Sequence, residues 1–426
     1  MAKAPDPNRN RRRLLIGGGA AALLTAGALA LRKPDRGAGG HDAYFQALSQ
    51  ALAEAGLAHP VLVVDRARML ANADAAAAAL AASGLPLRLV VKSLPSFGLL
   101  DPLAERLRTK RYMVFNGAML RQMIERKPNA DLLLGKPLPI AEAAPILATA
   151  PRNAPSLQWL IDSPQRLDAY IEVARAQNTP IKVNFEIDVG LHRGGFGGVD
   201  ELRAALMAAK AEPLVQVSGL MGYDPHVVKV PDQAGAFRRV QEIYREAIDC
   251  LTTELGVSPP TLTLNTAGSP TYTLHAAGTA ANEVSVGSAF VKPLDFDLPT
   301  LTEHQPAAFI ATPVIKTLDR ARVPGLESLA GVFSFWDPNS ARAFFIYGGH
   351  WLARPVSPPG LEYSSLFGRS SNQEMLTGSR HVNLAANEYV FFRPTQSEAV
   401  FLQFGPIAVY DDGRIVEMIE TFPVSA

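Results

Sequence analysis

The feature that most constrains the fold is a regular succession of short apolar runs separated by helical stretches. Eight such runs lie between residues 61 and 265, and most are bounded by turn residues and flanked by charges, as buried parallel strands are. The stretches between them, such as 66–83 and 232–255, carry apolar residues at helical spacing. This alternation predicts an α/β fold, and eight strands within about 230 residues favour a (β/α)8 barrel of the TIM type over a doubly wound open sheet. The expected strands are 61–65, 87–92, 111–115, 131–135, 157–161, 181–188, 215–221 and 261–265.

The pattern changes after about residue 300, where strand-like stretches follow one another without long helices between them. Prolines and glycines interrupt this region often, which is typical of a smaller all-β domain. We therefore expect a barrel over residues 58–299 and a C-terminal β-domain over 300–426. Residues 32–57 read as a linker followed by a short helix that could belong to either domain.

The first 31 residues have the composition of an export signal. Arginines precede an uncharged run, 14–31, that is rich in Ala, Gly and Leu. The segment Arg11-Arg12-Arg13-Leu14-Leu15 resembles a twin-arginine signal, and Ala28-Leu29-Ala30 offers a cleavage site. We expect an exported, periplasmic protein. The alternative is an uncleaved anchor in the inner membrane, because the apolar run is just long enough to span a bilayer.

Charge and cysteine content exclude some classes of function. The formal net charge is +1, from 41 basic and 40 acidic residues, and no long basic run lies outside the N-terminus. A nucleic-acid-binding surface is therefore not expected. Cys250 is the single cysteine, which excludes intramolecular disulfides and a thiolate metal cluster.

Lys92 ends the second expected strand, at the rim where barrel enzymes build their sites. It follows four largely apolar residues, so we expect few water molecules around it. Desolvation disfavours the ammonium form and makes the amine a usable nucleophile toward an aldehyde. A lysine in this place could also simply extend its amine to solvent.

Polar residues follow two further strands. Glu186 and Asp188 alternate on one strand, and a glycine-rich loop then presents His192 and Arg193. This group could bind a substrate carboxylate, exchange protons, or form ion pairs inside the barrel. Tyr223 comes just after the next strand, where tyrosines commonly serve packing alone.

A loop of small residues follows the eighth expected strand. Gly268, Ser269, Thr271 and Tyr272 lie there. In barrels, such loops after the last strands bind phosphate through backbone N–H groups. Together with Lys92, this loop supplies what pyridoxal 5′-phosphate requires, because the protein must hold the cofactor and tune its ring.

The order of these motifs resembles that in the D-threonine aldolase and D-serine dehydratase family, fold-type III enzymes with an alanine-racemase-like N-terminal barrel. The resemblance covers residues 58–290 well and 300–422 loosely. The motifs that carry it are His59-Pro60-Val61-Leu62-Val63-Val64-Asp65, Arg88 to Lys92-Ser93, Glu186-Ile187-Asp188-Val189-Gly190 with Arg193 and Gly195, Gly222-Tyr223, Gly268-Ser269-Pro270-Thr271-Tyr272, and Glu283 with Gly287-Ser288.

The resemblance implies a role for each motif. Lys92 would hold the cofactor as a Schiff base, Arg193 would lie against its ring, and Tyr223 would hydrogen-bond near cofactor and substrate. Gly287 and Ser288 would help to bind the phosphate, together with the loop residues Gly268, Ser269, Thr271 and Tyr272. Homodimerisation is also implied by the family.

The chain departs from the family where that family binds a divalent metal. A Glu-His pair and a Pro-Asn-His-x-Cys motif correspond here to Asn372-Gln373 and to residues 394–398, so glutamines replace both histidines and Glu398 replaces the cysteine. Glutamine is a poor zinc ligand. We therefore expect no metal, although Glu374 and Glu398 could hold a hard cation.

The sequence thus predicts a pyridoxal-phosphate-dependent lyase that acts on small amino acids, D-configured and β-hydroxylated, by aldol cleavage or by dehydration without a metal. Lys92 is the expected base, with Tyr223, His192 and Glu398 as candidates for a second acid or base. Racemisation on the same scaffold is one alternative. A non-catalytic protein that binds the cofactor or an amino acid is another.

Overall fold

The computed structural model describes residues 32–149, 154–320, 334–364 and 367–424. The chain divides into two compact units. The barrel unit comprises Val61–Ile310 and Arg393–Ala426, and the β unit comprises the residues up to Pro60 together with Ala311–Phe392. The expected export signal, 1–31, lies outside the described residues. Within the described ranges, no helix is both long enough and apolar enough to cross a membrane.

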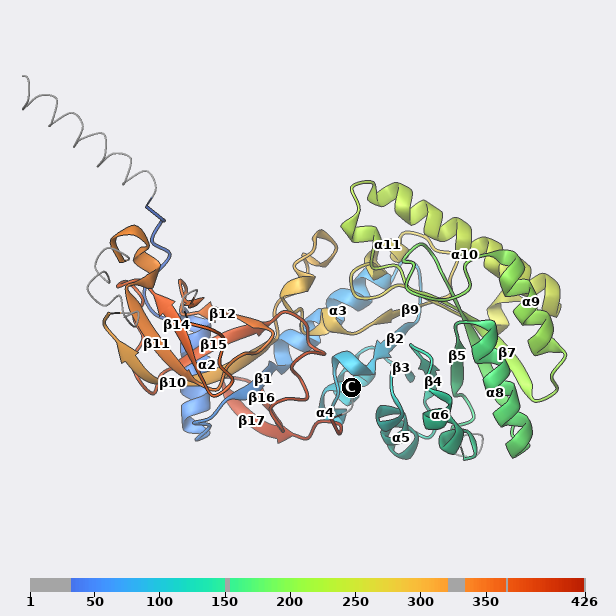
Figure 1. Ribbon diagram of the computed structural model, residues 1–426, viewed down its shortest axis with the longest axis horizontal. Coiled ribbons are helices and arrows are strands. Elements are labelled where there is room, and N and C mark those ends of the chain that lie inside the picture. Colours follow the sequence, from blue (N-terminus) through green and yellow to red (C-terminus); the bar gives the residue numbers. More distant parts are fainter. Residues whose placement is uncertain (1–31, 150–153, 321–333, 365–366, 425–426) are drawn as a thin grey trace, which may run out of the picture. The chain divides into compact units, whose positions relative to one another are not determined.

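Eight parallel strands, β2 to β9, close into a barrel surrounded by helices (Figure 1). The ring closes where β9 pairs with β2, with Leu87 opposite Val284. The predicted fold class is confirmed. The barrel strands are β2 (Leu87–Val90), β3 (Arg111–Val114), β4 (Asp131–Leu134), β5 (Gln158–Ile161), β6 (Ile181–Ile187), β7 (Val215–Gly222), β8 (Thr263–Thr266) and β9 (Glu283–Val286). The helices of this unit are α3 (Arg66–Leu80), α4 (Phe97–Arg106), α5 (Gly117–Arg126), α6 (Ile140–Leu147), α8 (Pro164–Gln177), α9 (Val199–Lys210), α10 (Gln233–Leu255) and α11 (Tyr272–Ala276).

Capping side chains fix the turns that lead from strands into helices. Ser96, Asn116, Ser163 and Asp232 each accept a hydrogen bond from a backbone N–H in the first turn of α4, α5, α8 and α10. Such caps satisfy N–H groups that have no partner within the helix. Because these turns follow the carboxyl ends of strands, the caps hold in place the rim of the barrel that carries the candidate site.

The structure corrects the identity of the first and last barrel strands. Residues 61–65 form β1 (Val61–Asp65), which pairs in parallel with β16 (Ile407–Asp411) and is not one of the barrel strands. The eighth barrel position is taken by β9, which is not among the strands expected from the sequence. β1 is as apolar as the barrel strands, and its pairing partner, β16, is distant in the sequence. Nothing in the local sequence of β1 therefore distinguishes it from a barrel strand.

The division into units also differs from the expected boundary at residue 300. Residues from Arg393 onward group with the barrel, because β16 pairs with β1 and with β17 (Arg414–Ile419). The last part of the chain therefore belongs to the unit that holds Lys92.

The β unit is built on antiparallel pairing of β13, β14, β11 and β10, while β12 pairs with β15. The helix expected within 42–57 belongs to this unit, where the ring of Phe45 lies 4.8 Å from that of Phe391. Its elements are α2 (Ala43–Glu54), β10 (Ala308–Leu318), which begins in the barrel unit, β11 (Arg342–Tyr347), β12 (Ala353–Ser357), β13 (Glu362–Tyr363), β14 (Gln373–Gly378) and β15 (Tyr389–Pro394), which ends in the barrel unit.

Candidate active site

A pocket with about 560 Å³ of empty space lies at the carboxyl ends of the barrel strands. This space includes solvent at the mouth of the pocket. Residues after β2, β3, β7, β8 and β9 contribute to its wall, as in TIM-barrel enzymes. The wall is formed by Val90, Lys92, Ser93, Met113, Phe115, Gly135, Arg193, Met221, Tyr223, Asn265, Ala267, Gly268, Ser269, Pro270, Ser285, Gly287, Ser288, Phe296 and Glu398.

Lys92 lies in a single 3-10 turn, Val91–Ser93, directly after the first barrel strand. Its Nζ is 4.6 Å from the centre of the Phe115 ring and 3.7 Å from Oε1 of Glu398. The lysine side chain is 40% exposed, so the water-poor surroundings expected from the sequence are not found. The structure instead gives this amine an ionic partner and an aromatic face.

Glu398 reaches the pocket from the segment after β15 and is held by serine hydroxyls. Oε1 accepts a hydrogen bond from Ser93 Oγ at 2.7 Å, and Oε2 accepts one from Ser397 Oγ at 3.1 Å. Ser288 Oγ lies 3.3 Å from Oε1. Burial by itself would raise the pKa of Glu398, but the Lys92 ammonium and the Ser93 hydroxyl lower it below its ordinary value. The group is therefore a carboxylate at neutral pH.

Arg193 and Tyr223 meet on the wall formed by the loops after β6 and β7. The guanidinium carbon of Arg193 lies 4.8 Å from the centre of the Tyr223 ring, and Nη2 lies 3.5 Å from Oε1 of Glu186. Burial raises the pKa of Tyr223, and the charge of Glu398 adds to this increase while Arg193 opposes it. The Tyr223 phenol is therefore protonated near neutral pH. Burial also raises the pKa of Glu186, although the positive charge of Arg193 acts in the opposite direction.

Two glycine-serine turns close the pocket after β8 and β9. Ser269 Oγ accepts hydrogen bonds from the N–H groups of Gly287, at 3.1 Å, and Ala289, at 3.0 Å, which ties the two turns together. A Cβ at Gly268 would lie 2.6 Å from a ring carbon of Tyr223, and a Cβ at Gly287 would lie 2.7 Å from Ser93 Oγ. Both positions therefore require glycine for close approach.

The predicted residues Thr271 and Tyr272 are buried behind these turns and do not line the pocket. Thr271 Oγ1 donates to Oδ1 of Asp224 at 2.7 Å, and the Tyr272 hydroxyl lies 3.2 Å from Nε2 of His304. Thr271 Oγ1 also accepts a hydrogen bond from the N–H of Gly268 at 3.3 Å. Their side chains thus support the loop from behind.

His192, a candidate for acid-base chemistry, does not line the pocket. Its side chain is 83% exposed, and Nδ1 lies 2.8 Å from Oδ2 of Asp188. Asp188 Oδ1 also accepts a hydrogen bond from the His192 N–H, which holds this residue at a φ of 56°. These contacts place the imidazole at the surface of the loop.

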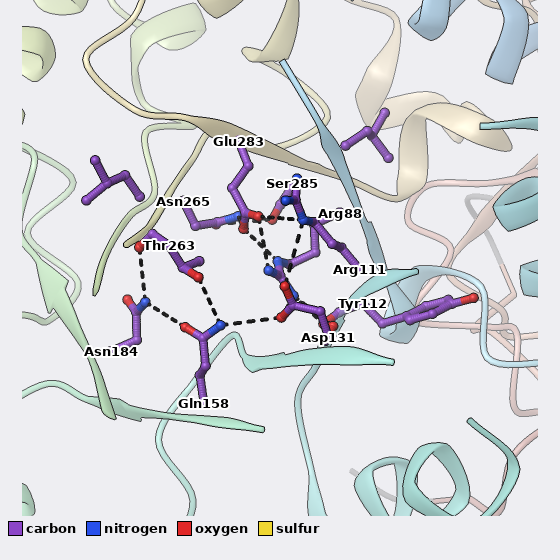
Figure 2. Close-up of polar contacts among 12 residues, drawn as sticks. Arg88, Arg111, Tyr112, Asp131, Gln158, Asn184, Thr263, Asn265, Glu283 and Ser285 are labelled. Carbon is purple, nitrogen blue, oxygen red and sulfur yellow. Dashed lines mark hydrogen bonds and ion pairs between the residues drawn. The ribbon is translucent and has the colours of Figure 1, made fainter. Parts of the chain in front are cut away.

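A buried polar network, which was not expected from the sequence, forms the interior of the barrel beneath the pocket (Figure 2). Arg88 lies within it, with its side chain fully buried, and contacts Glu283 and Asp131. Asn265 Nδ2 donates to Glu283 Oε1 at 2.7 Å and to Ser285 Oγ at 2.8 Å. Asn265 and Ser285 also line the pocket, so the network supports its floor. The available signal was a charged residue in each of two short strands, Arg88 in β2 and Glu283 in β9.

The stretches that correspond to the family's metal motifs have other partners here. Glu374, in the β unit, is buried, contacts the guanidinium of Arg369 and accepts a hydrogen bond from the N–H of His350 at 2.7 Å. Gln396, in the barrel unit, is exposed and donates to Asp295. Among the residues that the structure describes, no cluster of three or more His, Cys, Asp or Glu suited to a metal occurs.

The fold resembles those of solved pyridoxal-phosphate enzymes. D-threonine aldolase from Filomicrobium marinum shares 16% sequence identity, with 85% of this chain and 96% of that chain covered, at a TM-score of 0.70. D-threo-3-hydroxyaspartate dehydratase from Delftia sp. HT23 shares 15% identity, with 86% and 98% covered, at a TM-score of 0.69. Alanine racemase from Bacillus anthracis with bound L-Ala-P shares 15% identity, with 85% and 97% covered, at a TM-score of 0.65. At these identities the likeness establishes the fold.

Family membership follows from the sequence of the barrel. No curated protein matches the chain. The family described as "Alanine racemase, N-terminal domain" matches residues 64–293, which is more than half of the chain and includes every barrel strand. The chain therefore belongs to the alanine racemase N-terminal domain family of fold-type III proteins, whose cofactor is pyridoxal 5′-phosphate.

Proposed function

We propose that the chain is a pyridoxal-phosphate-dependent lyase that acts on small D-configured, β-hydroxylated amino acids at the pocket around Lys92. The observation that carries the proposal is the position of Lys92: a primary amine at the carboxyl rim of the barrel, in a pocket that two glycine-serine turns close. The names of two similar structures, a D-threonine aldolase and a D-threo-3-hydroxyaspartate dehydratase, support the lyase assignment.

The residues of the pocket fit the cofactor. An aldehyde needs an amine, which Lys92 supplies. A phosphate needs hydrogen-bond donors without bulky side chains, and the hydroxyls of Ser269 and Ser288 can serve, in turns that Gly268 and Gly287 keep narrow. Phe115, Met113 and Met221 provide apolar surface for a ring. When bound, the cofactor supplies an electron sink that stabilises negative charge on the α-carbon of an amino acid.

The side chains of the pocket divide the remaining tasks. Lys92 Nζ holds the cofactor and then exchanges a proton at the substrate's α-carbon. Arg193 lies over the face of Tyr223, so the two keep each other in place on one wall. Tyr223 remains a phenol near neutral pH and can donate a hydrogen bond to an anionic group. Glu398 provides the charge that opposes Lys92.

Racemisation is the second candidate function. The pocket holds two groups that can each carry a proton, Lys92 and Tyr223, and racemisation needs one on each side of the α-carbon. An alanine racemase is also among the proteins of similar fold.

The proposal also includes cell location and assembly. The pattern of residues 1–31 supports export, with cleavage or membrane anchoring as the two outcomes. A homodimer and catalysis without a divalent metal are further parts of the proposal, the latter supported by the partners of Glu374 and Gln396 described above.

The test is the visible absorption spectrum of the purified protein before and after borohydride, followed by peptide mapping. We expect a yellow band that borohydride removes and a reduced adduct on Lys92. The Lys92→Ala variant should lose both, and Lys229→Ala, which changes an exposed lysine, should keep both. A colourless wild-type protein that takes up no added cofactor would contradict the proposal.

A panel of D-amino acids then separates the reactions. Aldol cleavage releases an aldehyde and glycine, dehydration releases ammonia and a keto acid, and racemisation changes optical rotation alone. Cofactor bound at Lys92 with no product from any substrate would favour the non-catalytic binding protein.

A further inference from the structure

The pocket contains one carboxylate among its described wall residues, that of Glu398, beside the two cations Lys92 and Arg193. The chain supplies it from beyond the barrel strands, in the segment that follows β15. A charged group placed at the reacting end of a pocket strongly influences which side chains can enter it.

The position of Glu398 is fixed by its own segment before any ligand arrives. The N–H groups of Val400 and Phe401 donate to the carbonyl of Ser397, which makes a tight turn, and both apolar side chains are fully buried. The hydroxyls of Ser93 and Ser397 each donate to one carboxylate oxygen. A group held in this way is preorganised, because few of its rotamers remain available.

Glu398 also lies next to the point of reaction. Its Oε1 is 3.7 Å from Nζ of Lys92. This inference rests on the proposed function, in which the amino nitrogen of the substrate takes the place of that Nζ. The α-carbon and the first side-chain atoms of the substrate then lie one to three bonds from a nitrogen that is already close to the carboxylate.

Hydrogen bonding and charge give this carboxylate a selective effect. A carboxylate has about four acceptor sites, and the serine hydroxyls of the cluster use some of them, so it can still accept a hydrogen bond from a ligand. A second carboxylate on the ligand would instead meet a like charge in a partly enclosed pocket, where repulsion is stronger than in water.

We propose that Glu398 is a specificity-determining residue that favours amino acids with a hydrogen-bond donor on the side chain and rejects those with a second carboxylate. The class of substrate is thereby narrowed to small amino acids of the serine or threonine type, and acidic amino acids are excluded.

The test uses the cofactor-loaded full chain and measures dissociation constants from ligand-dependent shifts of the visible band. D-serine is compared with D-alanine, which lacks the donor, and D-asparagine with D-aspartate, which adds the charge. We expect the wild-type protein to bind the first member of each pair at least tenfold more tightly. Glu398→Gln should reduce both ratios to about threefold or less. The first ratio should fall through weaker binding of D-serine, because an amide oxygen accepts a weaker hydrogen bond than a carboxylate, and the second through tighter binding of D-aspartate.

Two further variants make the result specific. Glu398→Asp keeps the charge and should continue to reject D-aspartate, whereas Glu105→Gln, which neutralises an exposed carboxylate on α4, should leave both ratios as in the wild type. Unchanged ratios in Glu398→Gln, with the adduct on Lys92 intact, would overturn the inference and leave the proposed function standing.

The wild-type protein alone also tests the inference, should Glu398→Gln fail to fold or to load. Equal affinity of the wild type for D-aspartate and D-asparagine would overturn it. Failure of the proposed function has a different signature, namely a wild-type protein that forms no adduct on Lys92.

Discussion

The guanidinium of Arg88 donates two hydrogen bonds to the carboxylate of Glu283 inside the barrel, from Nε to Oε1 at 2.6 Å and from Nη2 to Oε2 at 3.0 Å. The arginine also donates to the side chain of Asp131, and all three residues lie on different strands. Burial would lower the pKa of Arg88, but the two carboxylates raise it above its ordinary value. The Arg88 guanidinium therefore stays charged although its side chain is fully buried.

Replacing Arg88 by Met should strongly destabilise the protein, because Glu283 would be left as a buried charge without its main partner. Removal of one partner of a buried pair costs about 3–5 kcal/mol. Urea denaturation gives the free energy of unfolding. Arg106→Met, which breaks an exposed pair with Asp74, is the matched control and should change this free energy much less. Equal losses in the two variants would show that the buried pair contributes no more than a surface pair.

Gly268→Ala should weaken cofactor binding, because the added Cβ would lie 2.6 Å from the Tyr223 ring and either the ring or the turn must move. Overpacking of this kind costs about 1–3 kcal/mol, which corresponds to about fivefold to a hundredfold in affinity. Absorbance titration of the cofactor-free protein with pyridoxal phosphate measures it. Gly197→Ala is the control, since a Cβ there has no atom within 4 Å. A Gly268→Ala protein that binds the cofactor as tightly as the wild type would disprove the close contact.

His304 should make stability depend on pH in mildly acidic solution. Burial, with a further contribution from Lys292, lowers the pKa of His304 to about 4. Between this value and the unfolded value near 6.5, the unfolded chain binds more protons, so stability falls as the pH falls through this range. The loss should reach about 3 kcal/mol at pH 4 for this one group.

The measurement is the free energy of unfolding of the wild type and of His304→Gln from pH 7 to pH 4. The variant lacks the titrating group, so the difference between the two proteins should shrink or reverse as the solution becomes more acidic. Parallel curves would show that His304 does not titrate differently in the folded state.

The barrel could be predicted from the sequence because its strands are short, apolar and regularly spaced, but the position of its seam could not. β1 is an apolar run like the others, and only its pairing with β16, more than three hundred residues later, removes it from the ring. Strand pairing at such a distance leaves no periodic signal. β9 was missed because its charged first residue, Glu283, belongs to the polar interior.

The candidate site, like the barrel, could be predicted only in part from the sequence. Lys92, Arg193, Tyr223 and the glycine-serine turns follow strand ends, and their place on one rim follows from barrel topology. Their roles remain predictions. His192, Thr271 and Tyr272 lie elsewhere because local hydrogen bonds to Asp188, Asp224 and His304 decide where their side chains point. Such contacts depend on packing that spacing along the chain does not encode.

The place of Glu398 in the chain has a consequence for biosynthesis. The last barrel strand, β9, ends at Val286, and Glu398 is translated long afterwards. Domains generally fold as units during synthesis. The barrel unit includes the residues from Arg393 onward, so its core can be completed only after Glu398 and β16 have been made. The same late segment therefore brings both the carboxylate that faces Lys92 and the strand that pairs with β1.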